Sequence, residues 1–253
     1  MTPPVREWDA ASYQRVSVPH EEWAKALLER LPLDGGETVL DAGSGTGRVT
    51  RMLVERLPEG KVVAVDGSEA MIKKVREVLR PSDEAFAADL TELRLEQPVD
   101  AVVSSAVFHW IADHETLFAR MRAALRPGGR LEAQCGGAGN INALRETATR
   151  LASKEPFAPY VGEIGEVWNY AGPEETEQRL RAAGFTDVAK AWLQPWDVTP
   201  DEPAEFLRTI CLGPYMDALP EELRDPFVAA LLAAEEQPLV MHYVRLNISA
   251  VAA

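Results

Sequence analysis

Short apolar runs alternate with amphipathic segments along the first half of the chain. Five runs have the composition of strands that a sheet buries on both faces, and they span residues 38–40, 61–66, 85–88, 100–105 and 130–135. The segments between them repeat apolar residues at helical spacing, as Leu117, Met121 and Leu125 do within residues 115–125. Strands that alternate with helices predict an α/β fold with a largely parallel sheet.

The second half of the chain adds helices and two closing strands. The pattern predicts helices at residues 141–153 and 173–183, two more within 201–235, and strands at 188–198 and 239–250. Another helix, at residues 21–31, precedes the first strand and ends before Pro32. An aromatic stretch broken by prolines, which contains Trp168 and Tyr170, is expected to form a pocket wall or lid.

One stretch joins the end of a strand, a glycine-rich turn and the start of a helix. After Asp41 the chain places glycines at positions 43, 45 and 47, and apolar residues at helical spacing follow. Glycine permits unusual φ/ψ values and the close approach of a ligand, while a helix N-terminus presents free N–H groups. The turn therefore predicts a site for a nucleotide-like cofactor.

The glycine spacing and one acidic residue indicate which cofactor it is. A dinucleotide fingerprint, G-x-G-x-x-G, requires glycine at position 48, where the chain has Arg48. Asp41 at the mouth of the loop would repel a pyrophosphate and attract an ammonium group. The pattern favours a zwitterionic amino-acid cofactor.

Carboxylates follow the next two strands. Asp66 closes the second strand about 20 positions after the loop, where a carboxylate accepts hydrogen bonds from ribose hydroxyls; the alternative is a turn or N-cap aspartate of the following helix. Asp89 follows the third strand, either as a reader of the adenine amine or as a loop carboxylate. Met71 would pack against the adenine or fill the core.

The residues after the fourth strand are expected at the chemical centre, because ligands of open α/β sheets bind beyond the carboxyl ends of the strands. Small Ser105 and Ala106 would flank the cofactor. Phe108, His109 and Trp110 would face the substrate. The alternative for His109 is a helix-entry histidine whose ring is satisfied by the backbone.

These motifs together resemble those of class I S-adenosylmethionine-dependent methyltransferases. More narrowly, the chain resembles the branch that contains trans-aconitate methyltransferase and juvenile hormone acid methyltransferase, which has a similar His-Trp or Gln-Trp pair after the fourth strand. The resemblance rests on residues 39–47, 65–66, 88–89, 108–110 and 125–131. It is close over residues 1–135 and loose over the remainder.

The resemblance implies a Rossmann-like sheet of seven strands, mostly parallel with the last strand antiparallel, and helices on both faces. A helical cap at about residues 201–235 would be inserted before the final strand. Residues 1–135 would hold the N-terminal helix and the cofactor-binding core. Residues 136–253 would hold the rest of the sheet, the lid and the cap, all within a single folded unit.

The implied cofactor is S-adenosyl-L-methionine, with S-adenosyl-L-homocysteine as product. The motifs carry over a set of cofactor-binding residues: Tyr13, Asp41, Gly43, Ser44, Gly45, Asp66, Gly67, Met71, Ala88, Asp89, Leu90, Ser105 and Ala106. Tyr13 would fold over the cofactor or pack against the first helix. The substrate-binding residues would be Phe108, His109, Trp110, Trp168 and Tyr170, with His109 as the catalytic residue.

A carboxylate acceptor, which the resemblance implies, is ionised at neutral pH and needs a donor to orient it, and His109, Trp110 and Tyr170 are candidates. A hydroxyl, phenol or amine acceptor would instead use His109 as a base. Arg145 and Arg208 are candidates for further acid groups of a polycarboxylate. Two more functions stay open: a nicotinamide-dependent oxidoreductase, which Arg48 and Asp41 argue against, and a non-catalytic cofactor-binding module.

Composition limits the classes of molecule that the protein is expected to bind. A formal charge of -14 and a pI near 4.8 argue against a nucleic-acid substrate. The two cysteines lie far apart in sequence, which fits a reducing compartment. No run resembles a signal peptide or a membrane span, so a cytoplasmic protein is expected. We expect it to be a monomer or a weak homodimer. The four histidines are scattered without the spacing of metal ligands, so no metal is expected in the reaction.

Overall fold

Seven strands form one sheet in the computed structural model, which describes residues 19–161, 164, 167–186 and 188–253. The strands are β1 (Thr38–Ala42), β2 (Lys61–Asp66), β3 (Glu84–Ala87), β4 (Val99–Ser105), β5 (Leu125–Gly136), β6 (Lys190–Val198) and β7 (Met241–Val251). Their order is β3-β2-β1-β4-β5-β7-β6, and β7 is antiparallel to both of its neighbours while the other pairs are parallel. The predicted fold is confirmed.

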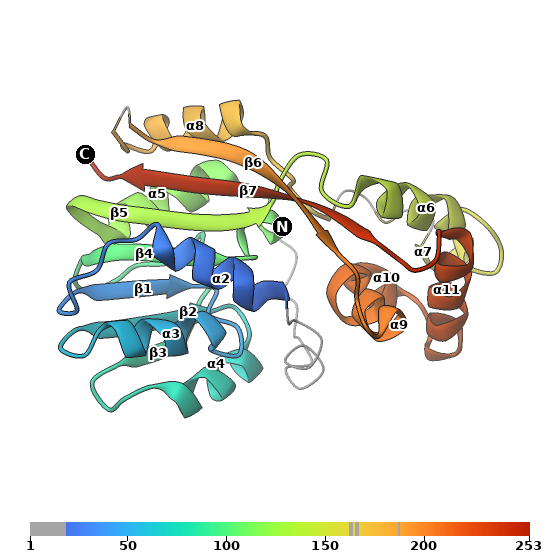
Figure 1. The fold of residues 1–253 in the computed structure, drawn as a ribbon, viewed down its shortest axis with the longest axis horizontal. Coiled ribbons are helices and arrows are strands. Elements are labelled where there is room, and N and C mark those ends of the chain that lie inside the picture. Colours follow the sequence, from blue (N-terminus) through green and yellow to red (C-terminus); the bar gives the residue numbers. More distant parts are fainter. Residues whose placement is uncertain (1–18, 162–163, 165–166, 187) are drawn as a thin grey trace.

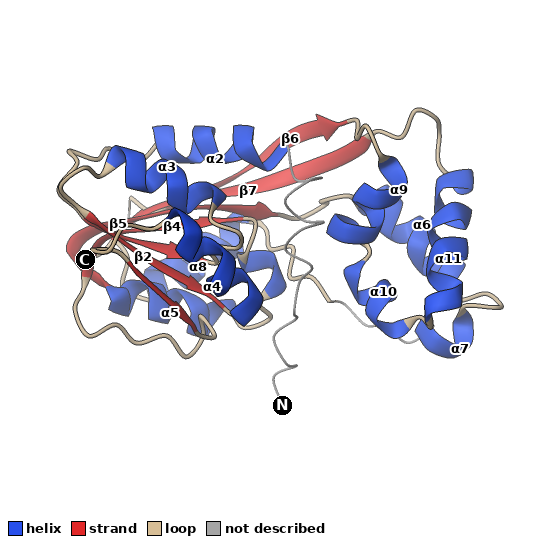
Figure 2. Ribbon diagram, turned by 90° about the horizontal axis from the view of Figure 1, so that it is seen from below, coloured by secondary structure: helices blue, strands red, loops and turns tan. Residues whose placement is uncertain are grey.

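Helices cover both faces of the sheet, as Figures 1 and 2 show. One face carries α2 (Pro19–Glu29), α3 (Arg48–Arg56) and α4 (Glu69–Val75), and the other carries α5 (His114–Ala124) and α8 (Pro173–Ala182). Alternate residues of β1 explain this arrangement, because Val39 packs with α2 and α3 while Leu40 packs with α5 and α8. Short 3₁₀ helices, η1 (Arg76–Val78) and η2 (Phe108–Trp110), follow α4 and β4.

A helical cap lies beyond the sheet, at the end toward which β6 and β7 extend (Figure 1). It consists of α6 (Asn142–Ala152), α7 (Ala158–Val161), α9 (Pro203–Phe206), the π-helical turn η3 (Leu207–Cys211), α10 (Gly213–Ala218) and α11 (Glu221–Ala234). The cap has its own buried core, to which Leu144, Leu207 and Phe227 contribute. The helices at 203–234 match the predicted insertion, and α6 and α7 from an earlier segment complete the cap.

One predicted boundary is wrong. The segment 126–129 was expected to end the preceding helix before a strand at 130–135, whereas β5 begins at Leu125 and pairs there with Val99 of β4. The register shifts between Val99 and Ala101, so the Pro-Gly-Gly turn is accommodated as an irregularity of the sheet. In the described ranges no helix has the length and apolar character that crossing a bilayer demands.

Candidate active site

The glycine-rich loop is tied to the end of β2. The N–H groups of Gly43 and Ser44 donate to the Val65 carbonyl at 2.7 and 3.0 Å. Gly43 has φ +83°, and a Cβ there would lie 2.2 Å from Val107 Cγ2, so only glycine fits. Gly45, at φ +53°, has nothing within 4 Å of a built Cβ, so its backbone borders open space.

Asp66 joins this loop to α4. Its Oδ2 accepts a hydrogen bond from Gly45 N–H and its Oδ1 accepts one from Ser68 N–H, both at 2.9 Å. The cap of α4 is Ser68, whose hydroxyl accepts from Met71 N–H. Asp66 is therefore held as a turn carboxylate beside the glycine loop, with Gly67 half-buried next to it and Met71 buried in the first turn of α4.

Asp41 lies beneath the loop in β1 and is 1% exposed. Its Oδ2 accepts a hydrogen bond from the Thr50 hydroxyl at 2.6 Å. Burial raises the pKa of Asp41 to about 7, the Thr50 hydrogen bond opposes the rise, and the nearby charge of Asp66 adds to it. A positive charge close to this pair would favour the ionised form of Asp41.

The end of β3 lies beside that of β2. Ala88 N–H donates to the Asp66 carbonyl at 3.0 Å. Asp89 Oδ1 accepts from the N–H and the hydroxyl of Thr91 at 2.8 and 2.7 Å, which matches the loop-carboxylate alternative for this residue. The Leu90 side chain is part of the main core, so a ligand would meet its backbone. These residues adjoin Asp66 as predicted, and their roles toward a cofactor stay predictions.

A row of hydrogen bonds crosses the sheet from the end of β4 to β7. Gln134 Nε2 donates to Ser105 Oγ at 3.1 Å, and Gln134 Oε1 accepts from Arg245 Nε at 3.1 Å. Ala106 follows with φ 61°, a conformation that non-glycine residues rarely adopt, and its N–H donates to the Gln134 carbonyl at 2.8 Å. The strained Ala106 lies at the boundary between β4 and a cavity.

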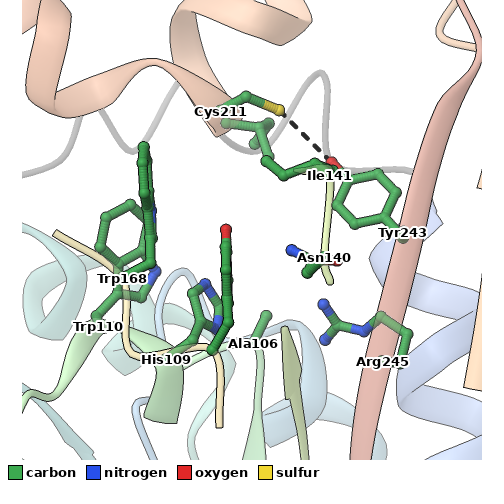
Figure 3. A pocket seen from close by; sticks show the side chains of 11 residues that line it. Ala106, His109, Trp110, Asn140, Ile141, Trp168, Cys211, Tyr243 and Arg245 are labelled. Atoms are coloured by element: carbon green, nitrogen blue, oxygen red, sulfur yellow. Dashed lines mark hydrogen bonds between the residues drawn. The ribbon is translucent and has the colours of Figure 1, made fainter. Parts of the chain in front are cut away.

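That cavity lies between the sheet and the cap, and the space between its lining atoms amounts to about 460 Å³ when the part open to solvent is counted. Its lining residues are Ala106, His109, Trp110, Asn140, Ile141, Trp168, Tyr170, Ile210, Cys211, Tyr243 and Arg245. Figure 3 shows Trp110 and Trp168 on one side and Asn140, Tyr243 and Arg245 on the other. The structure thus brings together four of the five predicted substrate residues.

His109 is buried at the base of this cavity. Its Nδ1 accepts a hydrogen bond from Gly136 N–H at 3.2 Å, so the neutral ring carries its hydrogen on Nε2. Its carbonyl accepts from Asn169 N–H at 2.9 Å, which holds the aromatic stretch against η2. The backbone therefore satisfies one of the two ring nitrogens of His109, as the alternative interpretation predicted, and the ring also lines the cavity.

The aromatic stretch forms one wall, as expected. The rings of Trp168 and Tyr170 are stacked 6.1 Å apart with an interplanar angle of 4°, and Trp110 lies 6.0 Å from Trp168. Burial raises the pKa of Tyr170, while a hydrogen bond with Asn140 lowers it. A Cβ on Gly136 would lie 2.5 Å from Tyr170 Cε1, so this glycine makes room for the ring.

Two predicted residues are not in the cavity. Phe108 was expected to face the substrate, but its ring is buried in the main core, 5.9 Å from the Phe118 ring, because η2 turns it toward α5. That prediction is wrong. Tyr13 lies outside the described residues.

Sequence reasoning missed six lining residues: Asn140, Ile141, Ile210, Cys211, Tyr243 and Arg245. One of the six could have been found from the sequence: Arg245 is a charged residue inside an otherwise apolar closing strand, which is a sign of a functional position. Arg145 stacks over Trp168 and Tyr170 at 5.6 and 5.1 Å, and Arg208 pairs with Asp225, so neither lines the cavity. Within the described part of the chain no three His, Cys, Asp or Glu side chains are grouped as metal ligands would be.

Comparisons with known proteins agree on one family. Residues 39–129 match the family model described as a methyltransferase domain. The trans-aconitate 2-methyltransferase of Azoarcus sp. strain BH72 is 33% identical over 88% of this chain and 87% of its own length. The enzyme of the same name from Variovorax paradoxus strain S110 is 30% identical over 88% of this chain and 86% of its own length.

Solved structures share the fold. The YcgJ protein of Bacillus subtilis aligns with a TM-score of 0.63 at 12% identity, over 92% of this chain and 99% of that one. Phosphoethanolamine N-methyltransferase 2 of Haemonchus contortus, solved with S-adenosyl-L-methionine, aligns with a TM-score of 0.57 at 20% identity, over 91% of this chain and 52% of that one.

Proposed function

This chain belongs to the class I S-adenosylmethionine-dependent methyltransferases, and we propose that it methylates a carboxylate oxygen of a small or medium organic acid without a metal ion. Membership of that family decides against the nicotinamide-dependent oxidoreductase and the non-catalytic module. The observation that carries the choice of a carboxylate is the hydrogen bond from Gly136 N–H to His109 Nδ1.

The residues around the glycine loop fit the cofactor. The Ser44 hydroxyl is buried without a hydrogen-bond partner among the described residues, and Gly45 borders open space, so the loop has a donor and room for a ligand. Asp41 and Asp66 supply negative charge for an ammonium group and acceptors for ribose hydroxyls. Asp89, the backbone of Leu90 and Met71 would contact the adenine in this proposal, since all three lie near the ends of β2 and β3.

His109 favours a carboxylate over a hydroxyl. A general base needs a lone pair for the proton it accepts, but Nδ1 uses its lone pair for Gly136 N–H and Nε2 carries the hydrogen of the neutral ring. Nε2 is therefore a donor, which suits an acceptor that is already ionised. His109 would orient a carboxylate, and the role of base would require the bond to Gly136 to break.

The remaining residues position the acid and exclude water. When bound, S-adenosylmethionine would supply a methyl group that its sulfonium activates, and the leaving sulfur would keep the electron pair of the broken bond. Trp110, Trp168 and Tyr170 form an apolar wall beside His109, and Arg245 supplies positive charge opposite them. Alignment of two reactants in such a cavity contributes on the order of 7–11 kcal/mol to catalysis.

The test is methyl transfer from S-adenosylmethionine to panels of carboxylic acids, phenols and amines, with products identified by mass spectrometry. We expect methyl esters, which mild alkali hydrolyses, whereas methyl ethers and methylamines resist that treatment. Transfer to phenols or amines, with none to any acid, would refute the proposal.

A further inference from the structure

Two residues that line the cavity have a strained backbone. In the part of the chain that the structure describes, the non-glycine residues with positive φ are Ala106, at 61°, and Ile141, at 45°, and both line the cavity. Such conformations persist only where the surroundings fix them, and they gather at functional sites. Figure 3 shows the two residues on opposite sides, Ala106 near His109 and Ile141 near Cys211 toward the cap.

Local structure does not explain the isoleucine at position 141. Its φ of 45° and ψ of 36° lie in the left-handed region, where a branched side chain is a genuine outlier. Ile141 is also the N-cap of α6, and isoleucine is among the poorest residues there because its side chain cannot accept a hydrogen bond. Asparagine or glycine would suit both the dihedral angles and the cap better.

Hydrogen bonds to β7 and α6 hold Ile141 in this conformation. The Ile141 N–H donates to the His242 carbonyl at 3.1 Å, and the preceding Asn140 accepts from Val244 N–H through its Oδ1 at 2.9 Å. The Ile141 carbonyl accepts from Arg145 N–H at 3.0 Å, which is the first helical hydrogen bond of α6. The strand and the helix therefore fix the direction in which the Ile141 side chain leaves the backbone.

That side chain bounds the cavity on the side of the cap. Ile141 is buried, belongs to the hydrophobic core of the cap and lines the cavity. His109 lies on the opposite side, where the proposed reaction holds the carboxylate. The part of an acceptor that is remote from its carboxylate would therefore extend toward Ile141.

We infer that Ile141 is a specificity-determining residue, whose branched side chain limits the size of the acceptor at the end remote from the carboxylate. The strained backbone is the cost of presenting that side chain to the cavity. This inference rests on the proposed function, since it states which acids the carboxylate-methylating site takes.

The test matches the space that Ile141→Gly opens with a group of similar size on the acceptor. A tert-butyl group has as many carbon atoms as the isoleucine side chain. Three pairs of compounds, each with and without this group, are compared: 3-phenylpropanoate and 3-(4-tert-butylphenyl)propanoate, succinate and 2-tert-butylsuccinate, and phenol and 4-tert-butylphenol. The size ratio is the kcat/KM of the tert-butyl compound divided by that of its parent, with S-adenosylmethionine as donor.

The wild type should disfavour the tert-butyl compound about 30-fold in the pair whose parent reacts fastest, and Ile141→Gly should raise the size ratio about 30-fold. An unchanged ratio in folded Ile141→Gly would overturn this inference and leave the proposed function standing. Reaction of phenol, with none of either acid pair, would remove the proposed function, while the phenol pair would still decide the role of Ile141.

Leu144→Ala is the matched control for loosening of the cap. Leu144 is buried on α6 in the same hydrophobic core and lies outside the described lining of the cavity. Its truncation should change the size ratio less than about 3-fold, because no atom that faces the acceptor is removed. A change as large as that in Ile141→Gly would assign the size limit to the packing of the cap and overturn the inference.

Thermal unfolding measures the strain. Leu144→Ala should lower the Tm by about 5 °C or more, and Ile141→Gly should lower it by less than half as much, because glycine adopts the left-handed conformation without cost. Binding of S-adenosylhomocysteine reports whether each variant folds. If Ile141→Gly does not fold, Ile141→Val decides: it removes a single methylene and should raise the ratio of 3-(4-methylphenyl)propanoate to 3-phenylpropanoate about 10-fold, whereas no change would overturn the inference.

Discussion

At the scale of single residues, the chemistry depends on hydrogen bonds that the sequence does not display. The sequence placed His109 after the fourth strand and left its role open between base and donor. The role depends on Gly136, which lies 27 positions away and reaches His109 only because β5 pairs with β4. Arg245 was missed for the same reason, since its partner Gln134 is 111 positions away.

We expect the His109→Gln variant to keep much of the wild-type activity, because the glutamine side-chain amide offers a donor near the position of His109 Nε2. His109→Leu, which has no donor to align the carboxylate with the methyl group, should lower kcat about 100-fold, the cost of a small displacement of a reacting group. With saturating cofactor, wild-type kcat should stay flat between about pH 6.5 and 9, because the carboxylate is already ionised. Steady-state kinetics with an acid substrate measures both effects.

If His109 were a base, His109→Gln would be as inactive as His109→Leu, and the pH profile would rise with the deprotonation of a single group.

Asp41 leads to a prediction about pH and cofactor binding. Its pKa of about 7 lies above its ordinary value of 3.8, so its contribution to stability is complete below about pH 3.8 and is lost as the pH rises through about 7. A bound cation favours the ionised form, so S-adenosylmethionine should bind about 3- to 10-fold more tightly at pH 8 than at pH 6. Calorimetry at pH 6.5 in buffers of different ionisation enthalpy should detect the release of a proton.

Asp41→Asn should abolish both the proton release and the pH dependence, since the amide does not titrate. The exposed Glu96→Gln is the matched control and should leave both unchanged. Proton release that persists in Asp41→Asn would assign the titration to another group.

At the scale of elements, the alternation of strands and helices predicted a largely parallel α/β sheet, and the family resemblance supplied its seven strands and the antiparallel last strand. Continuous apolar runs such as β2 are recognisable because both faces are buried. The start of β5 was missed because Pro127 and two glycines signal a helix end, while pairing with β4 keeps that segment in the sheet. Phe108 was misplaced because a short 3₁₀ helix turns consecutive side chains in different directions.

The end of β5 offers a test of how an element shapes the cavity. A Cβ at Gly136 would lie 2.5 Å from Tyr170 Cε1 and 2.8 Å from Asn140 Nδ2, so Gly136→Ala must displace the aromatic wall. We expect the KM for the acid to rise about 10-fold or more, because the rings that enclose the substrate move. Binding of S-adenosylhomocysteine, measured by calorimetry, should stay within about 3-fold of the wild type, since the atoms that a Cβ at Gly136 would meet belong to Tyr170 and Asn140 and not to the glycine loop.

Gly36→Ala is the control, because nothing lies within 4 Å of a Cβ built at Gly36. If both variants behaved alike, steric displacement of Tyr170 would not explain the loss.

At the scale of the whole molecule, α2 contacts two hydrophobic cores, because Trp23 packs in the core of the cap while Leu27 packs against the sheet. The sheet has its own buried cores, and the cap has a separate one built from segments on both sides of β6. The cap at 201–235 was predicted from the family resemblance, because the related methyltransferases insert helices between the two closing strands. The sequence did not predict that α6 and α7 join the cap, because an amphipathic pattern shows which face of a helix is apolar and not which surface covers it.

Trp23 of α2 connects these parts. Its ring lies 5.2 Å from the Tyr243 ring and 6.3 Å from the Trp196 ring, both edge-on, and the Arg245 guanidinium lies over its face. Trp23→Ala should lower the free energy of unfolding by about 3–5 kcal/mol, as for other buried aromatic residues, and should weaken acid binding because Arg245 loses its support. Trp23→Phe keeps a ring under Arg245, so it should cost less stability and largely preserve acid binding. Urea unfolding and calorimetry measure the two effects. Because Trp23 packs in the core of the cap and not in the cluster next to the glycine loop, cofactor affinity should change in neither variant. A Trp23→Ala protein that binds the acid as the wild type does would show that Arg245 keeps its position without the Trp23 ring.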